Sequence, residues 1–240
     1  MSKPLLFIAA FFLLFSASAQ ETTPNISFKF APLGLIVGSG NLQAEYNFGG
    51  KHSLTAKIGL PVNVRQVFDF EDQDAAFDLK AMSFLAGYRI YLSKKHFRGL
   101  YLEPFFKYVN HSSEGEGSGT LNSNPVRFNF TNEYNAAGIG AQLGAQFLIN
   151  KHFVIDLFFF GPEINSARNN FKASEQTRTL PWTSAEAREA ENDIRNFLDQ
   201  FPFVRNNTNV MIDQNNRIVT ATFQGALPGI RTGFSIGYAF

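Results

Sequence analysis

Serine, histidine and carboxylate side chains, the residue types of a hydrolytic triad, occur together in one short stretch of the sequence. His111 is followed by Ser112, Ser113, Glu114 and Glu116. A triad is defined by the geometry of its three groups and not by their order along the chain. The stretch also forms part of a Gly/Ser-rich segment, GEGSG, and these residue types are common in loops for conformational reasons alone. We therefore expect solvated loop residues here and predict no catalytic residue.

Three of the four histidines recur in short turn sequences, once per predicted hairpin. They are His52 in GGKH, His96 in KKH and His152 in NKH. A metal site would require these separate turns to converge, and the chain has no cysteine that could supply a thiolate ligand. We expect solvated turn residues, and we predict no metal ion and no cofactor. The sequence also contains no phosphate-binding loop and no zinc-protease helix motif.

Most of the chain alternates between apolar residues and polar or small ones, which is the period of a β-strand. The alternation predicts eight strands, over residues 26–36, 41–48, 53–60, 80–92, 99–110, 134–149, 153–160 and 229–240. The connections 49–52, 93–98 and 150–152 are short. The segments 65–78, 111–131 and 162–217 lack a clear pattern, and we expect them to be long loops. An even number of strands places both chain ends on the side of the short turns.

The rows opposite the apolar residues carry charges of both signs. In a closed barrel of eight strands these rows point inward and fill the narrow interior. Unpaired buried charge is costly, so we expect the cations and anions to pair and close the lumen. A narrow path for small hydrophobic or ionic solutes is the alternative. The predicted lumen charge network contains Lys29, Glu45, Lys57, Arg89, Glu103, Lys107, Asp156 and Arg231.

The start of the chain has the features of a secretory signal peptide, over residues 1–19. Lys3 precedes an apolar run over residues 5–15, and Ala-Ser-Ala at 17–19 is a cleavage site. The apolar run is too short to span a bilayer. The chain has no cysteine, so no lipoprotein anchor is expected after cleavage. We expect residues 20–240 to form the barrel.

The final stretch, GIRTGFSIGYAF at 229–240, alternates over its whole length and ends on an aromatic residue. Phe234, Tyr238 and Phe240 lie on its apolar row. An exported chain with such a last strand resembles the bacterial outer-membrane β-barrels, and the eight predicted strands resemble the OmpA/OmpX-like transmembrane barrels of Gram-negative bacteria. The resemblance implies an all-β fold, an eight-stranded antiparallel transmembrane β-barrel. It also implies an outer-membrane location, contact with outer-membrane lipids, and recognition of these three aromatic residues by the barrel-assembly machinery. A soluble β-sandwich or lipocalin-like barrel is the alternative fold.

The segment 162–217, between the last two predicted strands, contains a helix signal. Thr183 and Glu186 form a capping box, followed by apolar residues at helical spacing. Thr208–Asp213 and 217–223 predict a hairpin beside the helix. The helix either packs on its own fold as a lid, or docks a protein partner or the outer-leaflet surface. The candidate interaction surface of this extracellular loop contains Trp182, Ile194, Phe197, Leu198 and Phe201.

The charge balance excludes one class of partner. The chain has 21 basic and 20 acidic residues, and removal of Lys3 with the signal peptide leaves 20 of each. A nucleic-acid-binding protein usually shows a strongly basic surface, so we predict no nucleic-acid partner. The favoured function is a non-enzymatic structural or interaction role through the extracellular loops. The alternatives are a narrow solute channel and a lipid-modifying enzyme of the kind found among small outer-membrane barrels.

Overall fold

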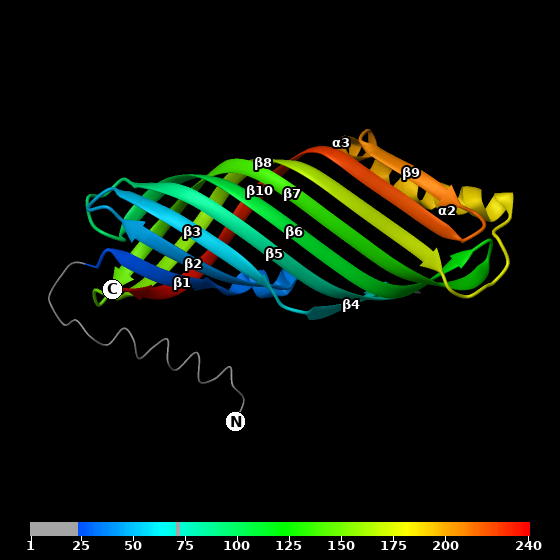
Figure 1. Cartoon of the computed structure of the whole chain (residues 1–240), viewed down its shortest axis with the longest axis horizontal. Coiled ribbons are helices and arrows are strands. Elements are labelled where there is room, and N and C mark those ends of the chain that lie inside the picture. Colours follow the sequence, from blue (N-terminus) through cyan, green and yellow to red (C-terminus); the bar gives the residue numbers. More distant parts are fainter. Residues whose placement is uncertain (1–23, 71–72) are drawn as a thin grey trace, which may run out of the picture.

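Eight antiparallel strands form a closed ring in the computed structural model, which describes residues 24–70 and 73–240. The predicted signal peptide lies outside the described residues. The pairing of Phe28 with Tyr238 belongs to the ladder between the first and last strands that closes the ring (Figure 1). The predicted all-β barrel fold is therefore confirmed. The strands of the ring are, in order, β1 (Ile26–Ala31), β2 (Ser39–Asn47), β3 (His52–Pro61), β5 (Gln73–Tyr91), β6 (Gly99–Leu121), β7 (Asn124–Ile149), β8 (Phe153–Glu175) and β10 (Ile218–Ala239).

Five further elements lie outside this ring. They are the short helix η1 (Pro32–Val37), β4 (Val64–Phe70), α2 (Ser184–Asp199), α3 (Pro202–Arg205) and β9 (Thr208–Asp213). β4 pairs with β5, and β9 pairs with the first residues of β10 as the predicted hairpin requires. In the described part of the chain, none of the helices has the length and apolar character that a membrane span requires.

Much of the three segments predicted to be loops is strand. Residues 65–78 lie mostly in the β4–β5 hairpin, and residues 111–131 continue β6 and β7 to a tight turn. In that turn Asn122 and Ser123 have φ angles of 50° and 62°, the left-handed conformation that two-residue hairpin turns require. β8 runs on to Glu175, so the connection to β10 covers residues 176–217 rather than 162–217.

The sequence pattern did not predict these strands, because the residues that alternate in them are polar and glycine and not apolar and polar. Outward positions of β6 beyond residue 110 are polar, among them Glu114 and Glu116, and several inward positions are glycine. The inward glycines make room for aromatic rings. A Cβ on Gly115 would lie 2.7 Å from the Phe77 ring, so glycine here reflects close packing and not a flexible loop.

The first strand is shorter than the sequence predicts, because a helix interrupts it. β1 ends at Ala31, and Pro32 opens η1 since its nitrogen has no hydrogen to donate to a ladder. Gly38, with φ of 75°, ends η1 and allows β2 to start.

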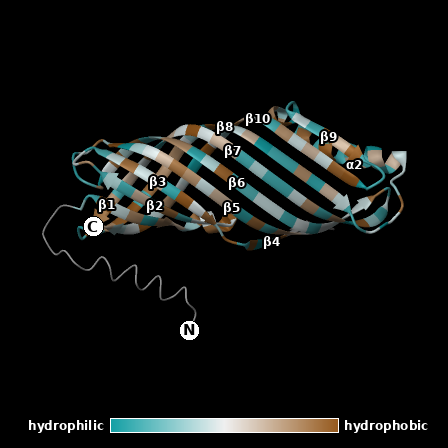
Figure 2. Ribbon diagram, in the orientation of Figure 1, coloured by the Kyte–Doolittle hydropathy of each residue, from teal (hydrophilic) through white to brown (hydrophobic). Residues whose placement is uncertain are grey.

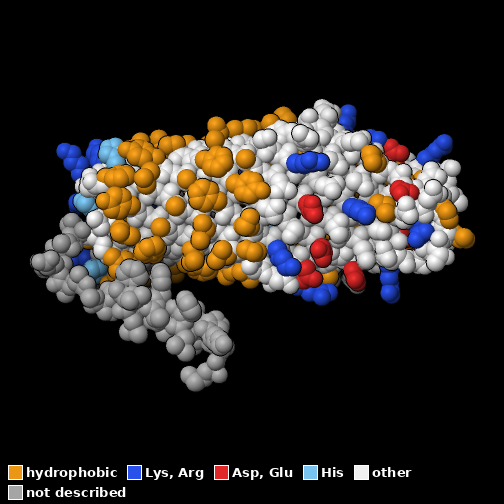
Figure 3. Space-filling view, viewed as in Figure 1, with side chains coloured by type: hydrophobic (Ala, Val, Ile, Leu, Met, Phe, Trp, Pro, Cys, Tyr) orange, Lys and Arg blue, Asp and Glu red, His pale blue; other side chains and the backbone are white. Residues whose placement is uncertain are grey.

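An apolar belt surrounds the half of the barrel that carries the short turns. On β6 the outward residues Leu100, Leu102, Phe106 and Tyr108 are all exposed, and this run spans about 26 Å of strand at ~3.3 Å per residue. Figures 2 and 3 show apolar residues over this half and charged ones over the other. At the usual strand tilt of roughly 35–45° this run on β6 covers about 20 Å along the barrel axis, close to the apolar band of roughly 25 Å on transmembrane barrels. Both described chain ends lie at the short-turn end (Figure 1).

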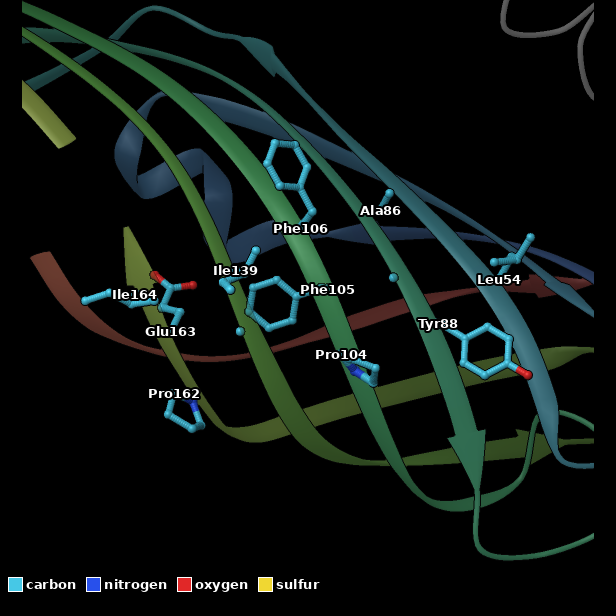
Figure 4. A pocket seen from close by; sticks show the side chains of 12 residues that line it. Leu54, Ala86, Tyr88, Pro104, Phe105, Phe106, Ile139, Pro162, Glu163 and Ile164 are labelled. Atoms are coloured by element: carbon cyan, nitrogen blue, oxygen red, sulfur yellow. The ribbon is translucent and has the colours of Figure 1, made fainter. Parts of the chain in front are cut away.

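Two prolines interrupt the ladders at one level of the belt. The β5–β6 ladder lacks a pairing at Pro104, and the β7–β8 ladder lacks one at Pro162. Proline cannot donate to a ladder. A shallow groove of about 860 Å³ lies on the barrel wall here (Figure 4), lined mainly by outward apolar side chains, with Phe105 and Glu163 of the inward rows also in its lining.

Candidate functional site

Buried ion pairs cross the lumen near its short-turn end. The Lys29 ammonium donates to Glu45 at 2.7 Å and to Asp156 at 2.8 Å. The Arg89 guanidinium donates to Glu103 at 2.8 Å and to Asp156 at 2.9 Å. These five side chains are at most 1% exposed. We call them the lumen plug.

Neutral side chains complete the hydrogen bonding of the three plug carboxylates. The Tyr91 hydroxyl donates to Glu45 and the Tyr101 hydroxyl to Asp156. Thr55 and Gln142 donate to the two oxygens of Glu103. The Arg89 guanidinium also lies 3.7 Å from the centre of the Tyr101 ring. Every carboxylate oxygen of the plug therefore has a donor, which favours a rigid arrangement of these groups.

The remaining charges lie further from the short turns, in a region that we call the upper chamber. Lys107 and Glu163 form an ion pair there. Lys57 lies over the Phe158 ring at 5.4 Å, and Arg231 lies over Phe158 at 4.9 Å and Phe105 at 5.4 Å. The eight residues of the predicted lumen network are thus divided between the plug and the upper chamber. The upper chamber is formed by Lys57, Phe105, Lys107, Phe158, Glu163 and Arg231.

Glu163 belongs to the chamber, although the sequence analysis placed it in a loop. A bulge in β8 makes both Phe159 and Phe160 point outward, and the ladder to β7 shifts by one residue there. The shift broke the alternation on which the prediction depended. The signal that could have identified Glu163 is the small or polar row that resumes after the three phenylalanines, with Gly161, Glu163 and Asn165.

Beyond the belt, the described residues 64–70, 73–80, 110–135 and 165–227 form what we call the extension. Its core contains Trp182 together with Leu121, Val126 and Val219. Trp182 is 3% exposed, and its indole N–H donates to Glu175 at 2.5 Å. Helix α2 therefore packs on inward-facing strand residues of the extension.

An ionic cluster holds the start of α2. Arg178 pairs with Glu175 and Glu186, and Thr183 and Glu186 form the predicted capping box. Hydrogen bonds from Arg178 and from the backbone of Thr183 lower the pKa of Glu186 to about 2. Burial tends to raise the pKa of Glu175, but the donors Arg178 and Trp182 outweigh it and lower that pKa. Both carboxylates are therefore charged at neutral pH.

The candidate interaction residues have two different environments. Trp182 and Leu198 are buried and Ile194 packs against the same core, so these three act as a lid. Phe197 and Phe201 are 59% and 48% exposed, with ring centres 5.6 Å apart. Phe203 of α3 is 72% exposed. It was not among the predicted residues, because it follows Pro202 and the predicted helix ends there. We call Phe197, Phe201 and Phe203 the aromatic patch.

The last strand is joined to the first by backbone and ring contacts. Phe240 donates its N–H to Ile26, and its ring lies edge-on to Phe28 at 6.2 Å. Tyr238 contacts the Phe240 ring at 4.8 Å and stacks on His152 at 5.1 Å. Phe234 lies on the same outward row. These contacts surround the seam that closes the barrel.

We predict that Phe240→Ser lowers the amount of barrel inserted in the membrane severalfold. The substitution removes the terminal aromatic residue proposed to be recognised during assembly, together with its ring contacts at the seam. The measurement is the fraction of heat-modifiable protein in isolated membranes. Phe160→Ser, an exposed belt position away from the seam, is the matched control; equal insertion of both variants would contradict a special role for the last residue.

The residues that could form a triad do not meet. His111 and Ser113 lie on the inward row of β6, whereas Ser112, Glu114 and Glu116 lie on the outward row. The turn histidines have other hydrogen-bond partners: His52 bonds to Tyr88 of β5, and the Gly50 N–H of the neighbouring turn donates to His96. No group of three metal-ligating side chains occurs among the described residues.

Two solved structures share the fold. One is CarO of Acinetobacter baumannii, with 11% sequence identity, a TM-score of 0.45, and coverage of 93% of this chain and 100% of the other. The second is CarO2 of Acinetobacter baumannii, with 10% identity, a TM-score of 0.47, and coverage of 90% and 98%. At this similarity the likeness concerns the fold alone. No protein-family model and no curated protein sequence matches the chain.

Proposed function

We propose that this chain is a non-enzymatic protein of the bacterial outer membrane, whose closed barrel anchors an extracellular extension with an interaction role. The apolar belt supports the membrane location. The closed ring of strands supports it as well, because only helices and closed barrels satisfy their backbone groups in lipid. The lumen plug supports a barrel that does not conduct. The separation of His111 from the outward Glu114 and Glu116 argues against catalysis in that stretch.

The observation that carries the interaction role is the aromatic patch. Large aromatic side chains are normally buried, and exposed clusters of them mark interaction sites. The patch holds three phenylalanines, each about half exposed or more: Phe197 on α2, Phe203 on α3, and Phe201 between the two helices. Because Trp182, Ile194 and Leu198 already join α2 to the extension, the patch is not needed to hold the helix.

The position of the patch favours the outer-leaflet headgroups as its contact. Val204 of α3 and Leu227 of β10 both pack against the cluster of Ala136, Ala167 and Phe223. Ile230, an exposed belt residue, follows Leu227 after three residues, about 10 Å along the strand. Aromatic side chains concentrate at that depth of a membrane. We infer that the patch rests on the lipid surface and orients the extension.

A photoreactive benzoylphenylalanine at Phe203 tests this contact in intact outer membranes. We expect lipid adducts at position 203 and several times fewer at Lys172, an exposed outward position on β8 of the extension. A discrete protein adduct at position 203 instead of lipid would identify a protein partner and overturn the lipid contact. Equal labelling at both positions would contradict an interaction role for the patch.

A further inference from the structure

The charges of the lumen do not balance. The plug contains two cations, Lys29 and Arg89, and three carboxylates. The upper chamber contains three cations and one carboxylate, and that carboxylate, Glu163, pairs with Lys107. The plug and the chamber together therefore hold five cations and four carboxylates.

Lys57 and Arg231 are the cations left without a carboxylate. Neither side chain forms an ion pair or a hydrogen bond with another described residue; the two cations lie over the rings of Phe158 and Phe105. A ring face binds a cation without using up its N–H donors, and lysine has three of these and arginine five. Lys57 is only 9% exposed. A buried cation without an anion is costly, so this pair favours the entry of an anion.

The plug closes the chamber on one side. The plug side chains below it are at most 1% exposed, whereas Lys107 of the chamber retains 20% of its side-chain surface and Arg231 is half-buried. Glu163 Oε2 and Asn165 Oδ1 are enclosed and have no protein donor. A small solute in the chamber therefore cannot continue past the plug.

We propose that the upper chamber binds one small monovalent anion, held by Lys57 and Arg231. One negative charge matches the excess of one cation, and both cations contact the same Phe158 ring. Small carboxylates and halides share this chemistry. The site does not depend on what the aromatic patch contacts.

The test is the line width of the chloride NMR signal with purified, folded protein in non-ionic detergent. We expect the wild type to broaden the signal and the double variant Lys57→Met/Arg231→Met to reduce the excess broadening at least tenfold. The matched control is Lys151→Met/Arg168→Met, which removes one lysine and one arginine from exposed positions and should broaden the signal like the wild type. Heat-modifiable migration checks folding, and the single variant Lys57→Met serves if the double variant does not fold.

Acetate added to the wild type distinguishes the two classes of anion. Loss of the chloride broadening on acetate addition supports a site shared with carboxylates, and persistence of a broadening that needs Lys57 supports a halide site. Broadening that is equal in the wild type and the double or single variant would overturn the proposal, because the chloride would then bind elsewhere. Absence of broadening in the wild type would overturn it as well.

Discussion

Replacing Arg89 with methionine is expected to lower the free energy of unfolding by about 3–5 kcal/mol, the usual cost of removing one partner from a buried ion pair. Arg89 lies between Glu45, Glu103 and Asp156. Without it, Lys29 is the only plug cation facing three carboxylates. No solvent reaches these groups to compensate, since their side chains are at most 1% exposed.

The measurement is the urea midpoint of the folded barrel in detergent, followed by heat-modifiable migration. Arg168→Met is the control, because Arg168 is exposed on the outward row of β8 and a solvated arginine contributes little. A midpoint for Arg89→Met that equals the control's would contradict the plug as a source of stability. Adding Glu103→Gln to Arg89→Met should recover part of the loss by removing one unpaired charge.

The second large effect is expected from Trp182→Ala, and it should be confined to the extension. Truncating a buried tryptophan typically costs about 3–5 kcal/mol, and Glu175 also loses its indole donor. We expect α2 to detach from the core formed by Leu121, Val126 and Val219. The belt strands keep their ladders, so the barrel itself should remain folded.

Limited proteolysis of membrane-embedded protein measures this effect. We expect cleavage within residues 176–207 to become at least tenfold faster in Trp182→Ala, with the barrel fragment still heat-modifiable. Leu180→Ala is the control, because Leu180 is nearby and 76% exposed. Unchanged cleavage would show that Trp182 does not hold the helix, and loss of the folded barrel would show that the extension is not independent of the belt.

The belt could be predicted from the sequence because two rules apply there at once. Outward positions of the belt, such as Leu102 and Phe106, are apolar, and inward positions such as Glu103 must be polar or small. The alternation along the strand is therefore strong. In the extension both faces differ: the outward residues are polar, and the inward positions include Gly115, which leaves space for the Phe77 ring. Single-sequence alternation cannot distinguish such a strand from a Gly/Ser-rich loop.

The candidate site was only partly predictable for similar local reasons. The inward charges of the belt can be predicted because every second residue of a strand points inward. The bulge at Phe159 and Phe160 shifts this alternation by one residue, so Glu163 was not assigned to the inward row. The capping box of α2 is local and was visible, whereas the exposure of Phe197 and the burial of Leu198 depend on what the helix packs against. Tertiary packing of this kind has no signal in a single sequence.

Conductance of the purified wild-type protein in planar lipid bilayers tests the closed barrel most directly. The buried plug predicts no steady current and no reproducible single-channel steps at moderate voltage, because ions would have to displace Lys29 and Arg89 from three carboxylates. Reproducible unitary steps from the wild type that change in size or disappear with Arg89→Ala or Glu103→Ala would contradict a closed lumen and establish the channel instead.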